Sequence, residues 1–314
     1  MSQDKTKTLA VVVPFLNEQE NLPALYQRLV SVMEKGPERL EILFVDDGST
    51  DGSPRWVTEK AREDGRVKLL RLSRNFGHQI AITAGLDHAR GDAVVIMDAD
   101  LQDPPEVIPD LLKKWREGYQ VVYAVRERRE GETWLKKFLA ASFYQVFRRL
   151  ANIDVPVNAG DFRLVDRQVV DALKQVRELH RFMRGLTTWV GFTQCAVHYE
   201  RGARLAGQTK YPVWKSARLA LDALTSFSGI PLRWVTTGGF VIALCGLLLL
   251  LQVVVNRLLH PSGYVQGWAT LIAVTLFLGG IQLVSIGMLG QYISRIYEET
   301  KKRPLYFVRE SVGL

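Results

Sequence analysis

Between residues 9 and 124, short continuous apolar runs alternate with amphipathic helical patterns. Continuous apolar runs are typical of strands buried on both faces, and the helices between them are the crossovers that parallel strands require. This part of the sequence therefore predicts an α/β fold with an open, mostly parallel sheet and helices on both faces. The expected strands are Leu9–Val13, Glu41–Val45, Val67–Leu72, Ala93–Met97 and Val121–Ala124, and the expected helices are Glu20–Lys35, Ser53–Asp64, Ile80–Ala89 and Glu106–Glu117, the last ending at Gly118.

A change in composition marks the C-terminal part of the chain. Trp234–Asn256 contains no charged residue, and a second uncharged stretch runs from Leu258 to Ser294, with its helix expected from Trp268. Each stretch exceeds the ~20 residues that a membrane helix needs. A buried soluble helix is the alternative interpretation, but two neighbouring segments without a polar face argue against it. We therefore expect two C-terminal transmembrane helices.

The distribution of basic residues predicts how these helices are oriented. Arg233 precedes the first segment, five basic residues follow the second, and the loop between them carries only Arg257. The positive-inside rule then puts both termini in the cytoplasm, in a multi-pass protein of the plasma (inner) membrane. The polar N-terminus, without an apolar signal region, agrees with this. The expected divisions are a cytoplasmic domain at 1–210, an interfacial amphipathic helix region at 211–230, two membrane helices at 231–295 and a basic cytoplasmic tail at 296–314.

The net charge of +8 suits anionic partners. Nucleic acid is not the expected partner, because no block of Lys and Arg is interleaved with aromatic residues on one helix. The basic residues instead gather beside the apolar segments, which favours a membrane surface. The amphipathic pattern Val213–Phe227 fits either an interfacial helix or one that packs on the soluble core. The cysteines Cys195 and Cys245 show neither a disulfide framework nor metal-ligand spacing.

Polar residues follow the expected strands at the sheet edge where α/β proteins bind ligands. The first strand is followed by Pro14 to Glu18, and the second by Asp46-Asp47-Gly48-Ser49. These groups could hydrogen-bond a nucleobase and ribose, and they could equally be ordinary turn residues.

Two carboxylates, Asp98 and Asp100, follow the fourth expected strand. Residues two apart on an extended chain point the same way, and hard divalent cations prefer oxygen ligands and keep positions for substrate phosphates. Together with Asp47 on another strand end, the pair predicts a site for a divalent metal, Mg²⁺ or Mn²⁺, and a diphosphate.

This set of motifs resembles the inverting family-2 glycosyltransferases with a GT-A fold, a Rossmann-like sheet. Within them it is similar to the polyprenyl-phosphate glycosyltransferases, the dolichol-phosphate mannose synthases and bactoprenol glucosyltransferases. The resemblance extends over nearly the whole chain. His78 departs from the family pattern, in which lysine is common at that position. We assign no function to His78 or to the other histidines. The matching segments are Val13–Glu18, Asp46–Ser49, Asn75–Gly77, Asp98–Pro105, Gly160–Leu164, Ala206–Tyr211, Ile281–Tyr297 and Lys302–Tyr306.

The resemblance implies an enzyme that transfers a hexose, with glucose from UDP-glucose favoured, to a polyprenyl phosphate such as undecaprenyl phosphate. It also implies a homo-oligomer, for example a tetramer. Asp161 would be the catalytic carboxylate facing the acceptor. The nucleotide would be held by Pro14, Glu18, Asp46, Asp47 and Asp98, the metal by Asp98, Asp100 and Gln102, and the phosphates by Arg126, Lys137, Arg201, Arg204 and Lys210.

The role of Asp161 stays open at this stage. A phosphate monoester has its second pKa near about 6, so the acceptor is mostly ionised at neutral pH and strong general-base help is not required. Asp161 is thus either a proton acceptor or a group that orients the acceptor or a cation. A helix cap or an ion pair with Arg163 is the structural alternative.

Other functions are weaker alternatives. A processive polysaccharide synthase would carry Gln-x-x-Arg-Trp, but the chain has Ile230 in place of the glutamine. A dinucleotide-dependent oxidoreductase would need a Gly-x-Gly-x-x-Gly turn after the first strand, and the residues after Val13 contain none. GDP-mannose or another UDP-sugar as donor, and a nucleotide-binding membrane scaffold without turnover, remain alternatives.

Overall fold

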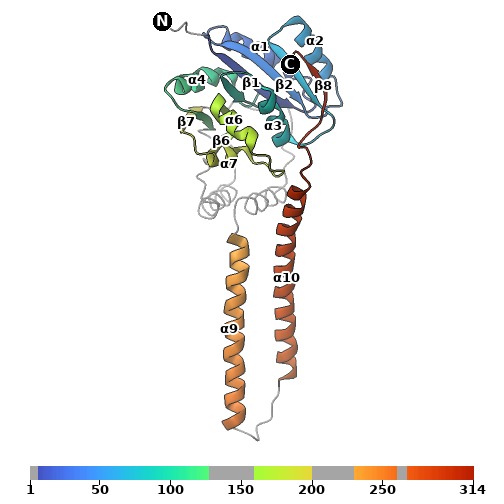
Figure 1. The fold of residues 1–314 in the computed structure, drawn as a ribbon, viewed down its shortest axis with the longest axis vertical. Coiled ribbons are helices and arrows are strands. Elements are labelled where there is room, and N and C mark those ends of the chain that lie inside the picture. Colours follow the sequence, from blue (N-terminus) through green and yellow to red (C-terminus); the bar gives the residue numbers. More distant parts are fainter. Residues whose placement is uncertain (1–5, 127–158, 200–229, 260–266) are drawn as a thin grey trace. The chain divides into compact units, whose positions relative to one another are not determined.

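The computed structural model describes residues 6–126, 159–199, 230–259 and 267–314 (Figure 1). The chain divides into two compact units, Met1–Pro212 with Pro304–Leu314, and Val213–Arg303. In the first unit the described strands are β1 Thr8–Phe15, β2 Arg39–Asp46, β3 Val67–Leu72, β4 Ala93–Ile96, β5 Val121–Arg126, β6 Ala159–Asp166, β7 Gln194–Tyr199 and β8 Val308–Val312. The helices are α1 Leu22–Met33, α2 Ser53–Glu63, α3 His78–His88, a 3-10 turn at Pro105–Val107, α4 Ile108–Arg116, α6 Arg167–Gln175 and α7 Met183–Trp189.

The described strands form one eight-stranded mixed sheet in the order β7-β5-β6-β4-β1-β2-β3-β8. Neighbours β4, β1, β2 and β3 are parallel, as are β5 and β7. Strand β6 runs antiparallel between β4 and β5, and β8 runs antiparallel to β3. The predicted α/β class and strands β1 to β5 are confirmed, whereas the sequence analysis did not foresee β6 or β8.

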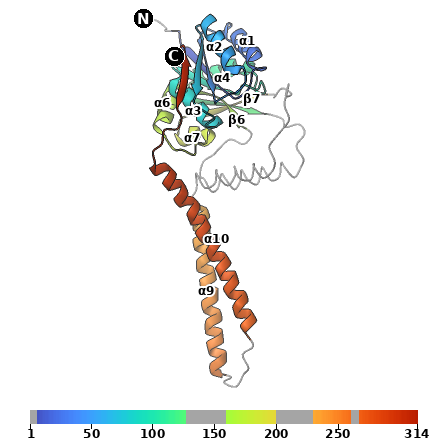
Figure 2. The same cartoon turned by 90° about the vertical axis from the view of Figure 1, so that its right-hand side faces the viewer.

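Helices cover both faces of the sheet (Figure 2). Leu9, Val11 and Val13 of β1 lie in a core cluster with buried residues of α1, α2 and α4. On the opposite face α3 packs closely on β1, since a Cβ atom at Gly85 would lie 2.2 Å from Val12 Cγ1. Both faces of the central strands are therefore fully buried, which explains why they read as continuous apolar runs.

The direction of each strand decides which residues meet at the ligand edge of the sheet. The parallel strands β1 to β4 all end there, and β5 ends there with Arg126. Strand β6 starts at this edge, because its Arg163 pairs with Ile96 near the end of β4. Asp161, two residues earlier on β6, therefore lies beyond the end of β4, close to the segment that begins at Asp98.

The C-terminal residues belong to the sheet of the first unit. Strand β8 pairs with β3, and the Ser73 amide donates to the Phe307 carbonyl at 2.9 Å. The Tyr306 hydroxyl donates to Asp87 Oδ2 at 2.9 Å, and burial together with the Asp87 charge raises the pKa of Tyr306. The sequence analysis treats residues 296–314 as a basic tail, and within that stretch residues 304–314 belong to the compact first unit.

The second unit contains two long helices, α9 Ile230–Leu259 and α10 Trp268–Thr300 (Figures 1 and 2). Among the residues that the structure describes, one segment, Phe277–Thr300, is long and apolar enough to cross a membrane, and α9 contains a shorter apolar stretch, Val235–Leu248. The Phe277–Thr300 segment is not buried within the protein. The described residues thus support one candidate span where the sequence predicts two, while the expected interfacial helix at 213–227 lies outside the described residues.

We predict that Tyr306→Phe destabilises the first unit. The substitution removes the hydroxyl that donates to Asp87, which should lower the free energy of unfolding by about 1 kcal/mol. The full-length protein in detergent should melt at a lower temperature, and amides of β3 should exchange hydrogen faster. Tyr119→Phe is the matched control, because the Tyr119 side chain is 37% exposed. Unchanged exchange in β3 would show that the Tyr306 contact does not hold the C-terminal segment in place.

Candidate active site

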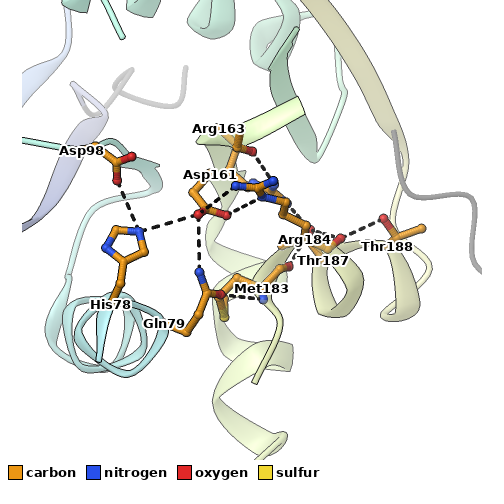
Figure 3. A network of polar contacts seen from close by, with 10 residues as sticks. His78, Gln79, Asp98, Asp161, Arg163, Met183, Arg184, Thr187 and Thr188 are labelled. Atoms are coloured by element: carbon orange, nitrogen blue, oxygen red, sulfur yellow. Dashed lines mark hydrogen bonds and ion pairs between the residues drawn. The ribbon is translucent and has the colours of Figure 1, made fainter. Parts of the chain in front are cut away.

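A buried carboxylate, Asp161, is the centre of a polar network at the ligand edge of the sheet (Figure 3). Its side chain is 8% exposed and forms a two-point ion pair with Arg184 of α7. Arg184 Nε donates to Asp161 Oδ1 at 2.9 Å, and Arg184 Nη2 donates to Oδ2 at 3.2 Å. Two parallel N–H···O bonds of this kind fix both the position and the plane of the two groups.

The imidazole of His78, at the start of α3, lies between two carboxylates (Figure 3). His78 Nε2 is 3.3 Å from Asp98 Oδ1 and 3.6 Å from Asp161 Oδ2. Burial would lower the pKa of His78, but the hydrogen bond to Asp161 and the charge of Asp98 outweigh it, so the pKa is raised. His78 therefore links the residue after β4 to the catalytic candidate on β6.

The next residue, Gln79, joins α3 to α7. Its Nε2 donates to Asp161 Oδ2 at 3.4 Å, and its Oε1 accepts from the Met183 amide at 2.9 Å. Arg163, the partner considered for Asp161 in the sequence analysis, instead donates to the Gly160 carbonyl at 2.9 Å and to Thr187. The ion pair with Arg163, which the sequence analysis gave as the structural alternative for Asp161, is replaced by one with Arg184.

The electrostatic surroundings shift the pKa values of Asp161 and Asp98 in opposite directions. Burial would raise the pKa of Asp161, but His78 and Arg184 outweigh it and hold that pKa far below the ordinary range of an aspartate. Burial raises the pKa of Asp98 to about 6, and the neighbouring charges of Asp161, Asp103 and Asp100 add to this against the opposing effect of His78. Asp98 thus carries an excess of negative surroundings that a cation would relieve.

The metal residues expected from the sequence lie on one turn after β4. Asp100 Oδ1 accepts from the Gln102 amide at 3.1 Å, and Leu101 between them has a positive φ of 58°. In the described part of the chain, the buried Asp98 Oδ1 accepts no hydrogen bond, and no three His, Cys, Asp or Glu side chains cluster as a complete metal site. Asp98 Oδ1, which has His78 Nε2 at 3.3 Å but accepts no hydrogen bond from the described residues, fits a divalent cation whose remaining ligands come from substrate and water.

The end of β2 and the loop after it are held to β3 and to the segment after β3 by side chains that the sequence analysis assigned to the nucleotide. Both oxygens of Asp47 accept backbone amides, from Phe76 at 2.7 Å and Gly77 at 3.0 Å. Burial raises the pKa of Asp47, and these two bonds partly offset that effect. Asp46 accepts from the Ser49 amide at 2.7 Å and from Arg71 at 3.1 Å. Both carboxylates therefore shape the loops.

The remaining nucleotide candidates lie beside these loops. Pro14 is buried at the end of β1, and the half-buried Glu18 accepts from Asn21 at 2.6 Å. Asn17 Oδ1 accepts from the Thr50 amide at 2.9 Å, which ties the first loop to the second.

The phosphate candidates are only partly described. The backbone of Arg126 ends β5 at the ligand edge, opposite Tyr199 of β7. Lys137, Arg201, Arg204 and Lys210, with the matching segment Ala206–Tyr211, lie outside the described residues.

The structure adds site residues that the sequence analysis missed, namely His78, Gln79 and Arg184. Gln79 and Arg184 belong to no motif noticed in the sequence. The departure of His78 from the family pattern was a signal, but its meaning depended on contacts with two distant strands.

An α/β sheet of this order, with acidic turns and a buried carboxylate at one edge, defines a GT-A-like sugar-nucleotide enzyme fold. Residues 10–174 match the sequence model of glycosyl transferase family 2. The chain belongs to this family and is a glycosyltransferase.

Individual relatives cover nearly the whole chain. It is 48% identical to the "Uncharacterized glycosyltransferase YkcC" of Bacillus subtilis over 97% of this chain and 94% of the relative. It is 41% identical to the "Bactoprenol glucosyl transferase" of Shigella phage SfII over 96% of this chain and 98% of the relative. Among solved structures, "Mannosyltransferase PcManGT" of Pyrobaculum calidifontis, in complex with GDP-Man and Mn²⁺, is similar with a TM-score of 0.50 and 17% identity over 96% of this chain and 89% of that chain. The similarity to this mannosyltransferase structure supports the fold alone.

We predict that Gly48→Ala disrupts the loop after β2. Gly48 has a φ of 81°, and a Cβ atom there would lie 2.6 Å from backbone atoms of Arg74 and Asn75. Because a backbone clash adds to a strained conformation, the loss of stability should be on the order of 2 kcal/mol or more. Faster amide exchange at Phe76 and Gly77 should accompany a lower melting temperature.

Gly65→Ala is the control for this substitution, because no heavy atom lies within 4 Å of a Cβ atom built at Gly65. Equal melting temperatures for the two variants would show that the approach of the two loops is not tight.

Proposed function

We propose that this glycosyltransferase transfers glucose from UDP-glucose to a polyprenyl phosphate, undecaprenyl (bactoprenol) phosphate, at the cytoplasmic face of a membrane. The observation that carries the proposal is the meeting of Asp98 and Asp100 with the buried Asp161–Arg184 pair at one edge of the sheet. The bactoprenol glucosyl transferases that align with nearly the full chain support the same donor sugar and acceptor.

The reaction is a single displacement. A phosphate oxygen of the lipid attacks C1 of glucose while the bond between C1 and the β-phosphate oxygen of UDP breaks. The electron pair of that bond leaves with UDP, and the configuration at C1 inverts. The attacking phosphate is mostly ionised at neutral pH, since its second pKa is about 6, so no proton has to be removed first. The protein must therefore mainly align two anionic substrates and stabilise charge on the leaving diphosphate.

Asp98, Asp100 and Gln102 would hold a divalent cation, Mg²⁺ or Mn²⁺. When bound, such an ion supplies positive charge that stabilises the leaving diphosphate. The buried, unsatisfied Asp98 Oδ1 supports this assignment. Pro14, Glu18 and Asp47 would lie around the nucleoside. Asp46 would shape the loop after β2 through its contacts with Ser49 and Arg71. Arg126, Lys137, Arg201, Arg204 and Lys210 would meet the phosphates.

The second unit would anchor the enzyme by two membrane helices, α9 and α10, with both termini in the cytoplasm. Exposed apolar side chains on both helices support this, among them Phe240 at 74% and Leu283 at 72% exposure. The glycines Gly279, Gly280, Gly287 and Gly290 of α10 have open space around them. Small residues of this kind suit helix packing in a homo-oligomer.

The transfer prediction is tested with the full-length protein in mild detergent, undecaprenyl phosphate and a panel of UDP- and GDP-sugars. Sugar should appear in the lipid fraction from UDP-glucose, and EDTA should abolish the transfer. Asp100→Asn should reduce the rate by on the order of a hundredfold or more, because it weakens the cation site. Asp110→Asn, at an exposed position of α4, is the matched control and should retain the wild-type rate.

Transfer from another donor alone would correct the sugar and leave the mechanism. Nucleotide binding without transfer from any donor would refute the enzymatic proposal in favour of a scaffold.

The membrane topology predicts the labelling of single cysteines in a variant that lacks Cys195 and Cys245. In intact cells a membrane-impermeant thiol reagent should label Ser262→Cys, between the helices, but label Ser2→Cys only after permeabilisation. Labelling of both positions without permeabilisation, or of neither, would contradict two spans with cytoplasmic termini.

A further inference from the structure

We propose that Asp161 acts on the reaction through Arg184: the carboxylate holds the guanidinium where it binds the phosphate of the lipid acceptor, and it removes no proton. This inference rests on the proposed function and assigns roles within the same site. It makes Arg184 a catalytic residue and Asp161, together with Gln79, a positioning residue.

The first step of the argument is that both oxygens of Asp161 are surrounded by nitrogen donors. Oδ1 accepts from Arg184 Nε, while Oδ2 accepts from Arg184 Nη2 and from Gln79 Nε2. His78 Nε2 approaches the same Oδ2 at 3.6 Å. A general base has to present a lone pair to the proton that it removes. Oδ2 of Asp161 already accepts from two donors, and a proton taken by Oδ1 would weaken the ion pair that this oxygen forms with Arg184.

The second step concerns which member of the pair faces solvent. The Asp161 side chain is 8% exposed, whereas that of Arg184 is 31% exposed. The carboxylate is therefore the inner partner and the guanidinium the outer one. The low pKa of Asp161 agrees with this, because a carboxylate that stays ionised keeps its cation in place across the whole physiological range.

The third step is that Arg184 is held at both ends, the guanidinium by Asp161 and the backbone by neighbouring groups. Its helix, α7, begins at Met183, whose amide donates to Gln79 Oε1 at 2.9 Å. Gln79 thus contacts both the carboxylate and the backbone beside the arginine. Thr188 Oγ1 donates to the Arg184 carbonyl at 3.2 Å. A guanidinium fixed in this way loses little further freedom when it binds an anion.

The last step is chemical. The acceptor phosphate arrives ionised and needs a cation that orients its attacking oxygen, not a base. Guanidinium is the group that recognises phosphate with fixed geometry, since its fork offers N–H groups on more than one edge. One edge of Arg184, Nε and Nη2, is turned to Asp161. A lysine could supply the charge but could not contact the carboxylate and a phosphate in the same geometry.

The test uses full-length enzyme in detergent and the variants Arg184→Gln, Arg184→Lys, Asp161→Asn and Arg184→Gln with Asp161→Asn. Initial rates are measured while each substrate is varied. The kcat/KM for undecaprenyl phosphate should fall on the order of a hundredfold in Arg184→Gln and less in Arg184→Lys. The KM for UDP-glucose should stay within about twofold of wild type. Arg177→Gln is the matched control, because Arg177 forms an exposed ion pair with Asp87.

The double variant separates the two roles of Asp161. If the carboxylate works through Arg184, Asp161→Asn should add less than about threefold to the loss already caused by Arg184→Gln. The pH profile of kcat in Asp161→Asn should keep the acid limb of the wild type, since ionisation of the acceptor phosphate causes it. A normal acceptor kcat/KM in Arg184→Gln, or loss of the acid limb in Asp161→Asn alone, would overturn the inference.

Direct binding of undecaprenyl phosphate, measured without donor, keeps this inference separate from the proposed function. Arg184→Gln should weaken that binding at least about tenfold and Arg177→Gln should not. If the wild type binds the lipid through Arg184 but transfers no sugar, the proposed reaction fails while the phosphate site stands. If the wild type transfers glucose and Arg184→Gln binds lipid normally, the inference fails alone. Melting temperature and UDP binding report whether each variant is folded. If Arg184→Gln does not fold, Arg184→Lys, which keeps the charge, is used in its place.

Discussion

The antiparallel pairing of β6 with β4 is the constraint on which the site depends. Because Arg163 pairs with Ile96, the first residues of β6 continue past the end of β4 and bring Asp161 beside the turn that carries Asp98. In an entirely parallel sheet, a strand would present its last residues at this edge and its first residues at the other. The reversal of one strand lets a carboxylate from the second half of the domain join acidic residues from the first half.

Placing the buried Asp161 near the half-buried Asp98 has an electrostatic cost, and the structure offsets it with two neighbouring basic side chains. His78 lies between Asp98 and Asp161, while Arg184 forms a two-point ion pair with Asp161. The outcome is unequal: Asp161 is stabilised as an anion, and Asp98 keeps a pKa raised to about 6 and an oxygen without a hydrogen bond. The same neighbourhood therefore shifts the pKa values of two nearby carboxylates in opposite directions, because the charge balance is local.

The C-terminal segment extends this organisation to the far side of the sheet. Strand β8 covers the edge of β3, and Glu310 lies 3.8 Å from Arg71, which also pairs with Asp46 at the end of β2. Glu310, which follows α10 in the chain, is thus connected through Arg71 to Asp46, one of the residues proposed to lie near the nucleotide. An uncovered edge at β3 would also expose unpaired backbone groups, which favours aggregation.

The sequence by itself determined the parallel core, the positions of its turns and the family. Buried strands must be continuously apolar and their ends polar, so β1 to β5 and the acidic turns at Asp46 and Asp98 can be read locally. It could not reveal β6, β8 or the partners of Asp161, because antiparallel insertion and edge pairing join residues far apart in the chain without a local period. Arg163 is near Asp161 in sequence, yet the side chain that binds the carboxylate is Arg184, 23 positions away. Only the tertiary structure decided this, since the fold brings the start of α7 against the start of β6 and directs Arg163 to Thr187.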